Sequence, residues 1–345
     1  MFNSFTRQRI AILPDGRRIL DSALGCCVAR AARGIYAVFQ LCEADEHRMF
    51  HSFIDDERWL QTVAAGRRPD ASVQDKAKAQ LAWHRARLVL RRPPAGAVVS
   101  HVSAAVLHGL PIISAVPELL EYSGPISRRT AHIRMHRPPR EAAEVSSVLG
   151  RPVTSPWATV RDLAADAGLA AAITAADHLL RGRSIITPDH SPAVVEVYSQ
   201  PVSERLRAAH AQASRCRSSA AAKRYVKVLR LARGLSESPA ESLAIAVLDV
   251  LGLTGAYRQQ VRLLNREGQE IARVDFLIGR IVVEVDGWSK YPAEDRAAAL
   301  HAFRAEKRRE DAIRALGYTV VRLEWADLID PARTAAKLRA AGVRV

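Results

Sequence analysis

Acidic side chains that can ligate a divalent cation lie close together in the segment Arg273–Asp286. Gly279 and Arg280 separate two apolar, β-branched runs, and a two-residue loop that begins with glycine favours a type II′ hairpin turn. In that hairpin Asp275 faces Glu284, and like charges directly opposite each other on a sheet are destabilising. A bound divalent cation would remove the repulsion, because hard cations prefer carboxylate oxygens.

The hairpin register also predicts how the other side chains are paired. The opposed pairs are Ile278–Ile281, Phe276–Val283 and Val274–Val285 on one face, and Leu277–Val282 and Arg273–Asp286 beside the acids. The first face is wholly apolar, so we expect it to be buried.

The same acids also have a purely structural interpretation. Asp286 can pair with Arg273 across the ladder, and Glu284 can pair with Arg304 or Arg308 on the helix that follows. Ion pairs of this kind are modest contacts. The sequence alone therefore leaves a metal site and a charge network open as alternatives.

The elements around the hairpin are predicted in the order α-β-β-β-α-β-α. They are a helix capped by Ser238 and Pro239 and ended by Gly252, strand Tyr257–Leu264, the hairpin, helix Ala297–Leu316, strand Tyr318–Trp325 and helix Pro331–Ala341. Glu241 lies on the first helix, where it can add a third oxygen ligand or orient a ligating water.

This αβββαβ order, with acids at these places, is the core of a restriction-endonuclease-like α/β fold. Phosphodiester hydrolysis requires a metal such as Mg²⁺ or Mn²⁺ to activate water and to neutralise charge on the phosphate. Such nucleases usually carry an acid, a spacer and then Glu-x-Lys, and here the lysine position is Asp286. Lys290 or Lys307 can supply the missing cation instead.

The charge of the chain is strongly and unevenly basic. The net charge is +15, and residues 235–345 carry 17 Lys and Arg against 16 Asp and Glu. Residues 1–234 therefore hold a net charge of +14. A basic balance of this size indicates a polyanionic partner, most often nucleic acid, and we expect DNA.

Residues 203–234 form a predicted basic helical connector with nine Lys or Arg and one acid. A solvated connector and a phosphate-contacting surface both fit this composition, and the acid cluster that follows favours the second. The expected DNA contacts are Arg215, Arg217, Lys223, Arg224 and Lys227, with Arg304 and Arg308 from the later helix.

The preceding sequence divides into two predicted regions. Residues 1–60 contain a short helix near residues 18–25 and a strand entered through Gly34, which fits either the end of a winged helix or an ordinary α+β element. Residues 70–202 are predicted as an α+β domain, and residues 235–345 as the nuclease-like domain. The α+β domain contains helices at Lys76–Arg91, Ser100–Gly109 and after Ser155, and strands at Glu118–Ser123 and Ala131–His136.

The remaining candidate metal ligands have weaker patterns. His101 and His108 lie seven residues apart on one helical face, and a structural role is favoured over a metal site. Cys26, Cys27, Cys42 and Cys216 form no Cys-x-x-Cys pair, so the spacing does not support a zinc site of the usual kind. Few cysteines, no secretory signal and no long apolar run predict a cytoplasmic protein without a membrane span.

Two segments near the C-terminus carry a family resemblance. Glu284–Tyr291 and Glu306–Leu328 resemble a group of actinobacterial proteins whose C-terminal domain is similar to the very-short-patch-repair endonuclease, in the PD-(D/E)XK nuclease superfamily. Val99–Pro111 and Val153–Ala164 resemble the middle region of the same proteins. There they follow a winged-helix segment of the AbiEi type, found in type IV antitoxins, whose Arg-Gly-Val-Tyr ending is similar to Ala32–Tyr36.

The resemblance implies site residues and two functions. Glu241, Asp275 and Glu284 match the acids of the superfamily, and Asp286 to Lys290 match the group's Asp-Gly-x-x-Lys. The repair enzyme has histidines after its acids, where this chain has Trp288 and Tyr291, so the mismatch-nicking mechanism does not transfer. We expect a Mg²⁺-dependent DNA endonuclease, or alternatively a non-catalytic antitoxin-like regulator with a relic nuclease fold. No residue pattern identifies a toxin partner.

Overall fold

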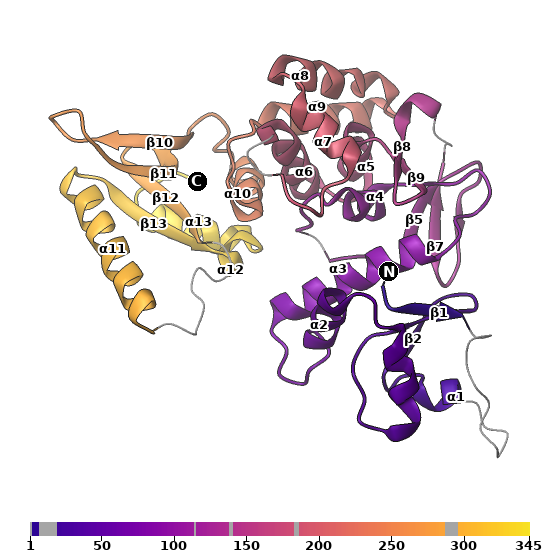
Figure 1. Cartoon of the computed structure of the whole chain (residues 1–345). Coiled ribbons are helices and arrows are strands. Elements are labelled where there is room, and N and C mark those ends of the chain that lie inside the picture. Colours follow the sequence, from indigo (N-terminus) through magenta and orange to yellow (C-terminus); the bar gives the residue numbers. More distant parts are fainter. Residues whose placement is uncertain (1, 7–18, 114, 138–140, 183–185, 287–295) are drawn as a thin grey trace. The chain divides into compact units, whose positions relative to one another are not determined.

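The described residues form both helices and strands, which confirms the expected mixed α/β class in a computed structural model (Figure 1). The structure describes residues 2–6, 19–113, 115–137, 141–182, 186–286 and 296–345. Within them, no helix has the length and apolar character needed to cross a membrane.

The chain forms two compact units. Unit 1 comprises Met1–Leu110, Ser114–Thr159 and Asp189–Ala193, and unit 2 comprises Pro111–Ile113, Val160–Pro188 and Val194–Val345. Compactness alone does not show which segments fold independently. The four expected divisions, at 1–60, 70–202, 203–234 and 235–345, therefore stay predictions.

Unit 1 begins with a small antiparallel sheet of order β1-β3-β2, in which Gly34 (φ 73°) turns β2 into β3. Its apolar core includes Phe5, Leu20 and Phe50. The elements are β1 (Ser4–Thr6), α1 (Ile19–Ala23), β2 (Val28–Ala32), β3 (Ile35–Val38), the 3₁₀ helix η2 (Asp45–Phe53), α2 (Glu57–Ala65) and α3 (Val73–Leu90). The strand expected after Gly34 is confirmed, and β2 is an additional strand paired with it.

A mixed six-stranded sheet of order β6-β7-β5-β4-β9-β8 forms the rest of unit 1. Ser100 precedes α4 (His101–His108), and Gly109 (φ 71°) ends that helix as predicted. The strands are β4 (Val98–Val99), β5 (Leu120–Ser123), β6 (Arg128–Arg129), β7 (Ile133–His136), β8 (Val145–Val148) and β9 (Arg151–Thr154). The 3₁₀ helix η3 (Ala142–Glu144) precedes β8, and the expected helix after Ser155 is α5 (Pro156–Asp166).

His108 has the structural role that was favoured for it. The side chain is fully buried, with Nε2 2.7 Å from the carbonyl oxygen of Thr154 and Nδ1 2.6 Å from Ser191 Oγ. A carbonyl oxygen only accepts, so Nε2–H donates to it and Nδ1 accepts from the hydroxyl. Both ring nitrogens are thus used within the protein.

Unit 2 opens with a group of helices, and the basic segment 203–234 belongs to this group. These are α6 (Leu169–Arg181), α7 (Pro192–Ser199), α8 (Val202–Ala211), the 3₁₀ helix η5 (Ala213–Arg215) and α9 (Ser219–Leu231). Tyr225 of α9 is buried and donates a 2.9 Å hydrogen bond to the carbonyl oxygen of Ala209 in α8. Arg205 is only 7% exposed and donates to the carbonyl oxygens of Leu179 and Leu180 at the end of α6. The segment is therefore a packed part of unit 2 rather than a solvated connector.

A four-stranded sheet of order β10-β11-β12-β13 completes unit 2, and its elements follow the predicted order. The first three strands are antiparallel neighbours, and β12 and β13 run parallel. The elements are α10 (Pro239–Val250), β10 (Arg258–Leu264), β11 (Glu270–Ile278), β12 (Ile281–Asp286), α11 (Arg296–Ala315), β13 (Thr319–Glu324), α12 (Trp325–Leu328) and α13 (Pro331–Ala340). Among these described elements, the short helix α12 was not anticipated. Ile313 of α11 packs with Leu277 and Val282 on the sheet.

Candidate functional site

The β11–β12 hairpin has the register that the sequence predicts. Phe276 pairs with Val283, and Ile278 pairs with Ile281. Gly279 has a φ of 57°, while Arg280 is not among the described residues with positive φ, as a type II′ turn requires. The apolar face of the hairpin is buried, also as expected.

Asp275 and Glu284 meet on the opposite face of this hairpin. Asp275 Oδ2 accepts a 2.9 Å hydrogen bond from the backbone N–H of Val285, which fixes its carboxylate beside β12. Glu284 is 8% exposed and lies within hydrogen-bonding reach of Asp275. The two carboxyl groups therefore come from neighbouring strands and face one another.

Burial and the negative charge of Asp275 raise the pKa of Glu284 to about 7, although the Arg309 guanidinium works against this shift. A proton bridging the two oxygens relieves the repulsion between two carboxylates. Burial and the neighbouring negative charge thus both favour the protonated form of Glu284.

Glu241 of α10 is the third carboxylate of the group. Ser238 caps the helix by accepting from the backbone N–H of Glu241. Glu241 Oε2 in turn accepts 2.9 Å hydrogen bonds from the backbone N–H of Glu237 and from Gln260 Nε2. Burial and then the charge of Asp275 raise the pKa of Glu241, with the hydrogen bonds opposing them. The carboxylates of Glu241 and Asp275 are therefore close enough to repel one another.

Gln260 is a site residue that the sequence did not reveal. It adopts a left-handed conformation (φ 53°) and interrupts the pairing of β10 with β11, since Gln259 and Val261 are paired on either side of it. Non-glycine residues with positive φ are uncommon, and such strain often collects near functional sites. The irregularity directs its amide to Glu241.

Arg309 is the cation that contacts Glu284 among the residues that the structure describes. Its Nη2 lies 2.9 Å from Glu284 Oε1 and 2.8 Å from the carbonyl oxygen of Arg273, and its Nη1 lies 3.2 Å from Glu306. The ion pair expected between Glu284 and Arg304 or Arg308 is thus made by the next residue of the helix. One turn holds 3.6 residues, so a one-residue step rotates a side chain by about 100°, which sequence spacing resolves poorly.

The predicted lysines are not seen at the carboxylates. Lys290 lies outside the described residues, as do Trp288 and Tyr291. Lys307 is exposed, as are Arg304 and Arg308. A separation of two residues turns Lys307 by about 200° from the Arg309 direction, to the far side of α11. Its role as a catalytic cation stays a prediction.

Asp286, at the usual lysine position, pairs with Arg322, and Glu306 connects Arg322 to Arg309. Its Oδ2 lies 3.4 Å from Arg322 Nη1, and Arg322 Nη2 lies 2.7 Å from Glu306 and 2.9 Å from Glu310. Arg273, the expected partner of Asp286, lies 2.6 Å from Glu237. The ion pairs of Arg322 with Asp286, Glu306 and Glu310 link β12 and β13 to α11.

Several of the expected phosphate-contacting residues of unit 2 already contact acidic side chains or a carbonyl oxygen. Arg217 pairs with Asp166 at 2.8 Å, and Lys227 pairs with Asp249 at 2.5 Å. Arg224 donates to the carbonyl oxygen of Ala165 at 3.4 Å. Arg215 and Lys223 are exposed on η5 and α9. The surface is basic, but part of its charge is balanced locally.

Folding also brings together side chains that the sequence spacing did not indicate. Cys26, Cys27, Cys42 and His47 of unit 1 place their Sγ atoms and a ring nitrogen within 4.8 Å of one another. The adjacent cysteine pair and the Cys42-x₄-His47 spacing are the sequence patterns that mark this cluster.

The three carboxylates do not form a group of this kind. Among the described residues, the groups whose ligand atoms all lie within 4.8 Å of one another do not include the set Glu241, Asp275 and Glu284. Glu241 is thus better placed to orient a water than to complete a three-carboxylate metal site.

Comparisons with known proteins provide no relative for this chain. A scan of protein-family models, a search of curated proteins and a search of solved structures each found no match. The arrangement of Glu241, Asp275, Glu284 and Arg309 must therefore carry the functional argument on its own chemistry.

Proposed function

We propose that this chain is a DNA-binding protein whose C-terminal segment is a restriction-endonuclease-like domain that hydrolyses phosphodiester bonds with Mg²⁺ or Mn²⁺. The observation that carries the proposal is the facing pair Asp275 and Glu284, on adjacent strands of a β10-β11-β12-β13 sheet. The element order and the parallel pairing of β12 with β13 support the fold part of this proposal.

The chemistry of the donor set fits a hard divalent cation. The pair offers only carboxylate oxygens, which Mg²⁺ and Mn²⁺ prefer. Burial and then the negative charge of Asp275 raise the pKa of Glu284, and a bound cation would offset both effects. Asp275 and Glu284 would hold the ion, which when bound would polarise the phosphate and activate water.

The side chains around the pair have distinct roles in this proposal. Asp275 is oriented by the Val285 N–H, so its second oxygen is directed without loss of side-chain entropy on binding. Glu241, held by Gln260, orients a water near the pair. Arg309 places a guanidinium beside Glu284, where it can stabilise negative charge on a phosphate. It would thereby take the part expected of a lysine.

DNA binding rests on the exposed basic residues of unit 2. Lys223 on α9 and Arg304 and Arg308 on α11 are exposed, and such side chains neutralise phosphates without reading sequence. Arg205 is excluded from this surface by its burial.

A second function has an observation in its favour. Arg309 already pairs with Glu284, and Asp286 at the motif-lysine position pairs with Arg322. A permanent guanidinium counter-ion would leave the fold intact without a metal. The chain would then be a non-catalytic, antitoxin-like DNA-binding regulator.

Cleavage and binding separate the two functions when both are measured on the full chain. Supercoiled plasmid is incubated with Mg²⁺ or Mn²⁺, and the nicked and linear forms are quantified. Glu284→Ala should abolish cleavage and retain salt-sensitive DNA binding, whereas Glu270→Ala, which removes an exposed acid on the neighbouring strand β11, should cleave normally. Wild-type protein that binds but never cuts duplex, single-stranded or mismatched DNA would favour the regulator.

The binding surface is tested by the salt dependence of affinity. Removing one side chain that neutralises a phosphate should reduce the slope of log affinity against log salt by about 1. Lys223→Ala should therefore flatten the slope, and Arg339→Ala on α13 serves as the control, since it is exposed outside the proposed surface. Equal slopes for wild type and both variants would remove α9 from the interface.

A further inference from the structure

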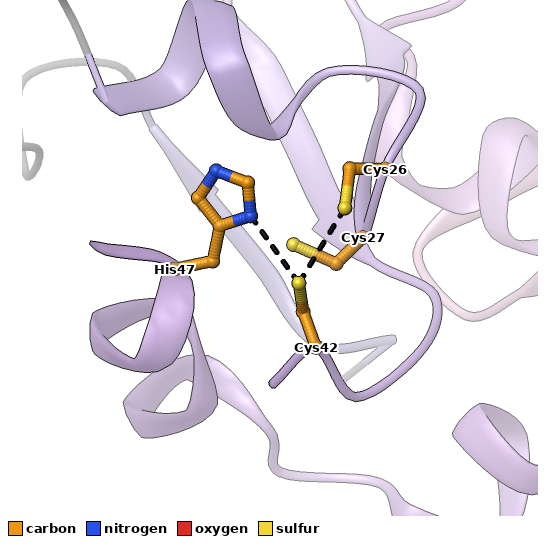
Figure 2. A group of neighbouring side chains, drawn as sticks. All are labelled: Cys26, Cys27, Cys42 and His47. Carbon is orange, nitrogen blue, oxygen red and sulfur yellow. Dashed lines mark hydrogen bonds between the residues drawn. The ribbon is translucent and has the colours of Figure 1, made fainter. Parts of the chain in front are cut away.

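Three cysteines and a histidine converge at one end of the β2–β3 hairpin in unit 1 (Figure 2). Cys26 and Cys27 occupy the turn between α1 and β2, Cys42 follows β3, and His47 lies on η2. Cys26 Sγ is 3.4 Å from Cys42 Sγ, and Cys42 Sγ is 3.3 Å from His47 Nδ1. Figure 2 shows the four side chains directed toward a common centre.

The backbone explains how two adjacent cysteines face the same centre. Neighbouring residues of a strand point to opposite faces, but these two precede the first residue of β2. Gly25 has a φ of 83°, and the backbone N–H groups of Cys26 and Cys27 both donate to the carbonyl oxygen of Ala23. The tight turn thus presents both thiols together.

A backbone hydrogen bond at the end of the β2–β3 hairpin lies beside the cluster. The backbone N–H of Phe39 donates a 2.9 Å hydrogen bond to the carbonyl oxygen of Cys27, which extends the β2–β3 pairing to the residues beside the cluster. The Cys27 side chain is 1% exposed and belongs to the apolar core, with Cys26 and Cys42 packed against it. The group is therefore built into the fold rather than formed by mobile surface side chains.

We propose that Cys26, Cys27, Cys42 and His47 form a structural Zn²⁺ site. Zinc binds thiolate sulfur at about 2.3 Å and imidazole nitrogen at about 2.0 Å in a closed tetrahedron, and Cys₃His is one of its structural ligand sets. Those bond lengths place tetrahedral ligand atoms roughly 3.5–3.8 Å apart. The observed separations of 3.3 and 3.4 Å, with all four atoms within 4.8 Å, fit around one ion.

The histidine is oriented as a zinc ligand requires. Ser22 Oγ donates to the carbonyl oxygen of Ile19 at 2.8 Å, so its single hydrogen is used. His47 Nε2 lies 3.0 Å from Ser22 Oγ and must therefore carry the proton and donate it. That tautomer leaves the Nδ1 lone pair directed at the cluster. A second partner that fixes the ring in this way accompanies most metal-bound histidines.

The chemistry of the thiols also favours a soft divalent ion over an empty pocket. Three thiol sulfurs and one imidazole nitrogen within 4.8 Å of one another are soft donors, and metal ligation requires thiols to lose their protons. Zn²⁺ would replace the thiol protons and neutralise the thiolates. Hard Mg²⁺ would not take sulfur ligands, so this site is separate in chemistry from the carboxylate pair.

The proposed ion would act as a cross-link in a small core. It would join the α1–β2 turn, the segment after β3 and η2, which are separated along the chain but close a single apolar cluster. Small cores of this kind often rely on a metal for part of their stability. The site carries no open position, so its role is structural rather than catalytic.

The full chain provides the test and its controls. Protein purified without chelator is analysed for metal by elemental mass spectrometry, then stripped and titrated with Co²⁺ to read the absorption of tetrahedral cobalt thiolate. We expect one zinc ion per chain. Cys42→Ser and His47→Ala should lose it, and Cys216→Ser, which removes the cysteine of unit 2, should keep it. Ser22→Ala should weaken binding about 10–100-fold as a positioning residue.

A ligand exchange covers the case in which a variant fails to fold. His47→Cys retains four ligands and should bind zinc, with a shifted absorption spectrum for bound cobalt. Loss of zinc binding in both His47→Cys and Cys216→Ser would contradict the assignment. A folded wild-type chain that contains no zinc and gives no cobalt–thiolate absorption would overturn the proposal. A Cys26–Cys42 disulfide in zinc-free protein would overturn it as well, in favour of a redox pair.

Discussion

Substituting Glu284 by glutamine should stabilise the metal-free protein, and more so at high pH. Glutamine resembles the protonated form of Glu284, because it can accept from Arg309 and donate to Asp275 without a charge. The folded pKa of Glu284 is raised above the unfolded value, so the folded state holds more protons between about pH 4.5 and 7. Stability contributed by that proton is present at low pH and is lost as the pH rises through this window.

The size of the effect follows from the pKa shift. A rise from the ordinary value of 4.5 to about 7 corresponds to about 3 kcal/mol of folding free energy at pH 8, at about 1.4 kcal/mol per unit. At pH 5 the unfolded carboxyl is itself partly protonated, and the same calculation gives about 1 kcal/mol. For units of this size about 1 kcal/mol moves the Tm by about 2–4 °C. Glu284→Gln should therefore gain about 5–10 °C more over wild type at pH 8 than at pH 5.

Thermal unfolding in EDTA at both pH values measures this difference directly. Comparing variant with wild type at each pH removes the titration of other groups, which have their own pH dependence. Glu310→Gln is a control of opposite sign, because hydrogen bonds from Arg314 and Arg322 lower the pKa of Glu310. That substitution should destabilise at pH 8. An equal Tm gain for Glu284→Gln at pH 5 and pH 8 would refute the raised pKa of Glu284 in the folded state.

Three further predictions concern the metal, the buried histidines and the buried arginine. Mg²⁺ or Mn²⁺ should raise the Tm of wild type by mass action, since a hundredfold excess over Kd adds about 2.7 kcal/mol to the free energy of unfolding. Asp275→Asn should lose this response, while Glu270→Gln should keep it. An unchanged response in Asp275→Asn would place the ion elsewhere. Burial lowers the pKa of His84 and of His108 to about 4. The free energy of unfolding of unit 1 should therefore fall by up to about 3 kcal/mol per histidine as the pH falls from about 6.5 to 4. Hydrogen exchange of α3 and α4 measures this loss, and His108→Gln should reduce it. Arg205→Ala should destabilise unit 2 by about 1–3 kcal/mol, because it leaves the carbonyl oxygens of Leu179 and Leu180 without the Arg205 hydrogen bonds. Arg207 is exposed, so Arg207→Ala should change the Tm little. Similar Tm values for the two variants would argue against a stabilising role of Arg205 at the end of α6.

Local rules were sufficient to predict the hairpin and its flanking helices. Gly279 and the period-two alternation specify the turn and the register, so the meeting of Asp275 with Glu284 follows from a handful of residues. The cap formed by Ser238 is equally local and places Glu241 in the first turn of its helix. The short helix α12 is an exception, because it is local in sequence and was not expected.

Long-range contacts were the part that sequence reasoning missed. Arg309 rather than Arg308 reaches Glu284 because α11 lies on the sheet at one rotation out of several that its charged sequence allows. The cysteine cluster depends on the β2–β3 pairing, which brings Cys27 and Cys42 together over fifteen residues. Arg205 resembles its basic neighbours in sequence, and only the packing of α8 on α6 shows that it is buried.

The charge balance around Arg309 bears on whether the carboxylate pair is a metal site or a closed ion-pair network. Arg309 divides its hydrogen bonds among Glu284, Glu306 and the carbonyl oxygen of Arg273, so it cannot neutralise Glu284 alone. Despite this contact the pKa of Glu284 remains near 7. Glu241 and Asp275 add further negative charge, and Arg309 is the cation seen at the pair among the described side chains. Burial is the first cause of that raised pKa and the charge of Asp275 the second, and the contact with Arg309 does not offset the two together. The expected response of the Tm to Mg²⁺ or Mn²⁺ therefore decides between the metal site and the ion-pair network.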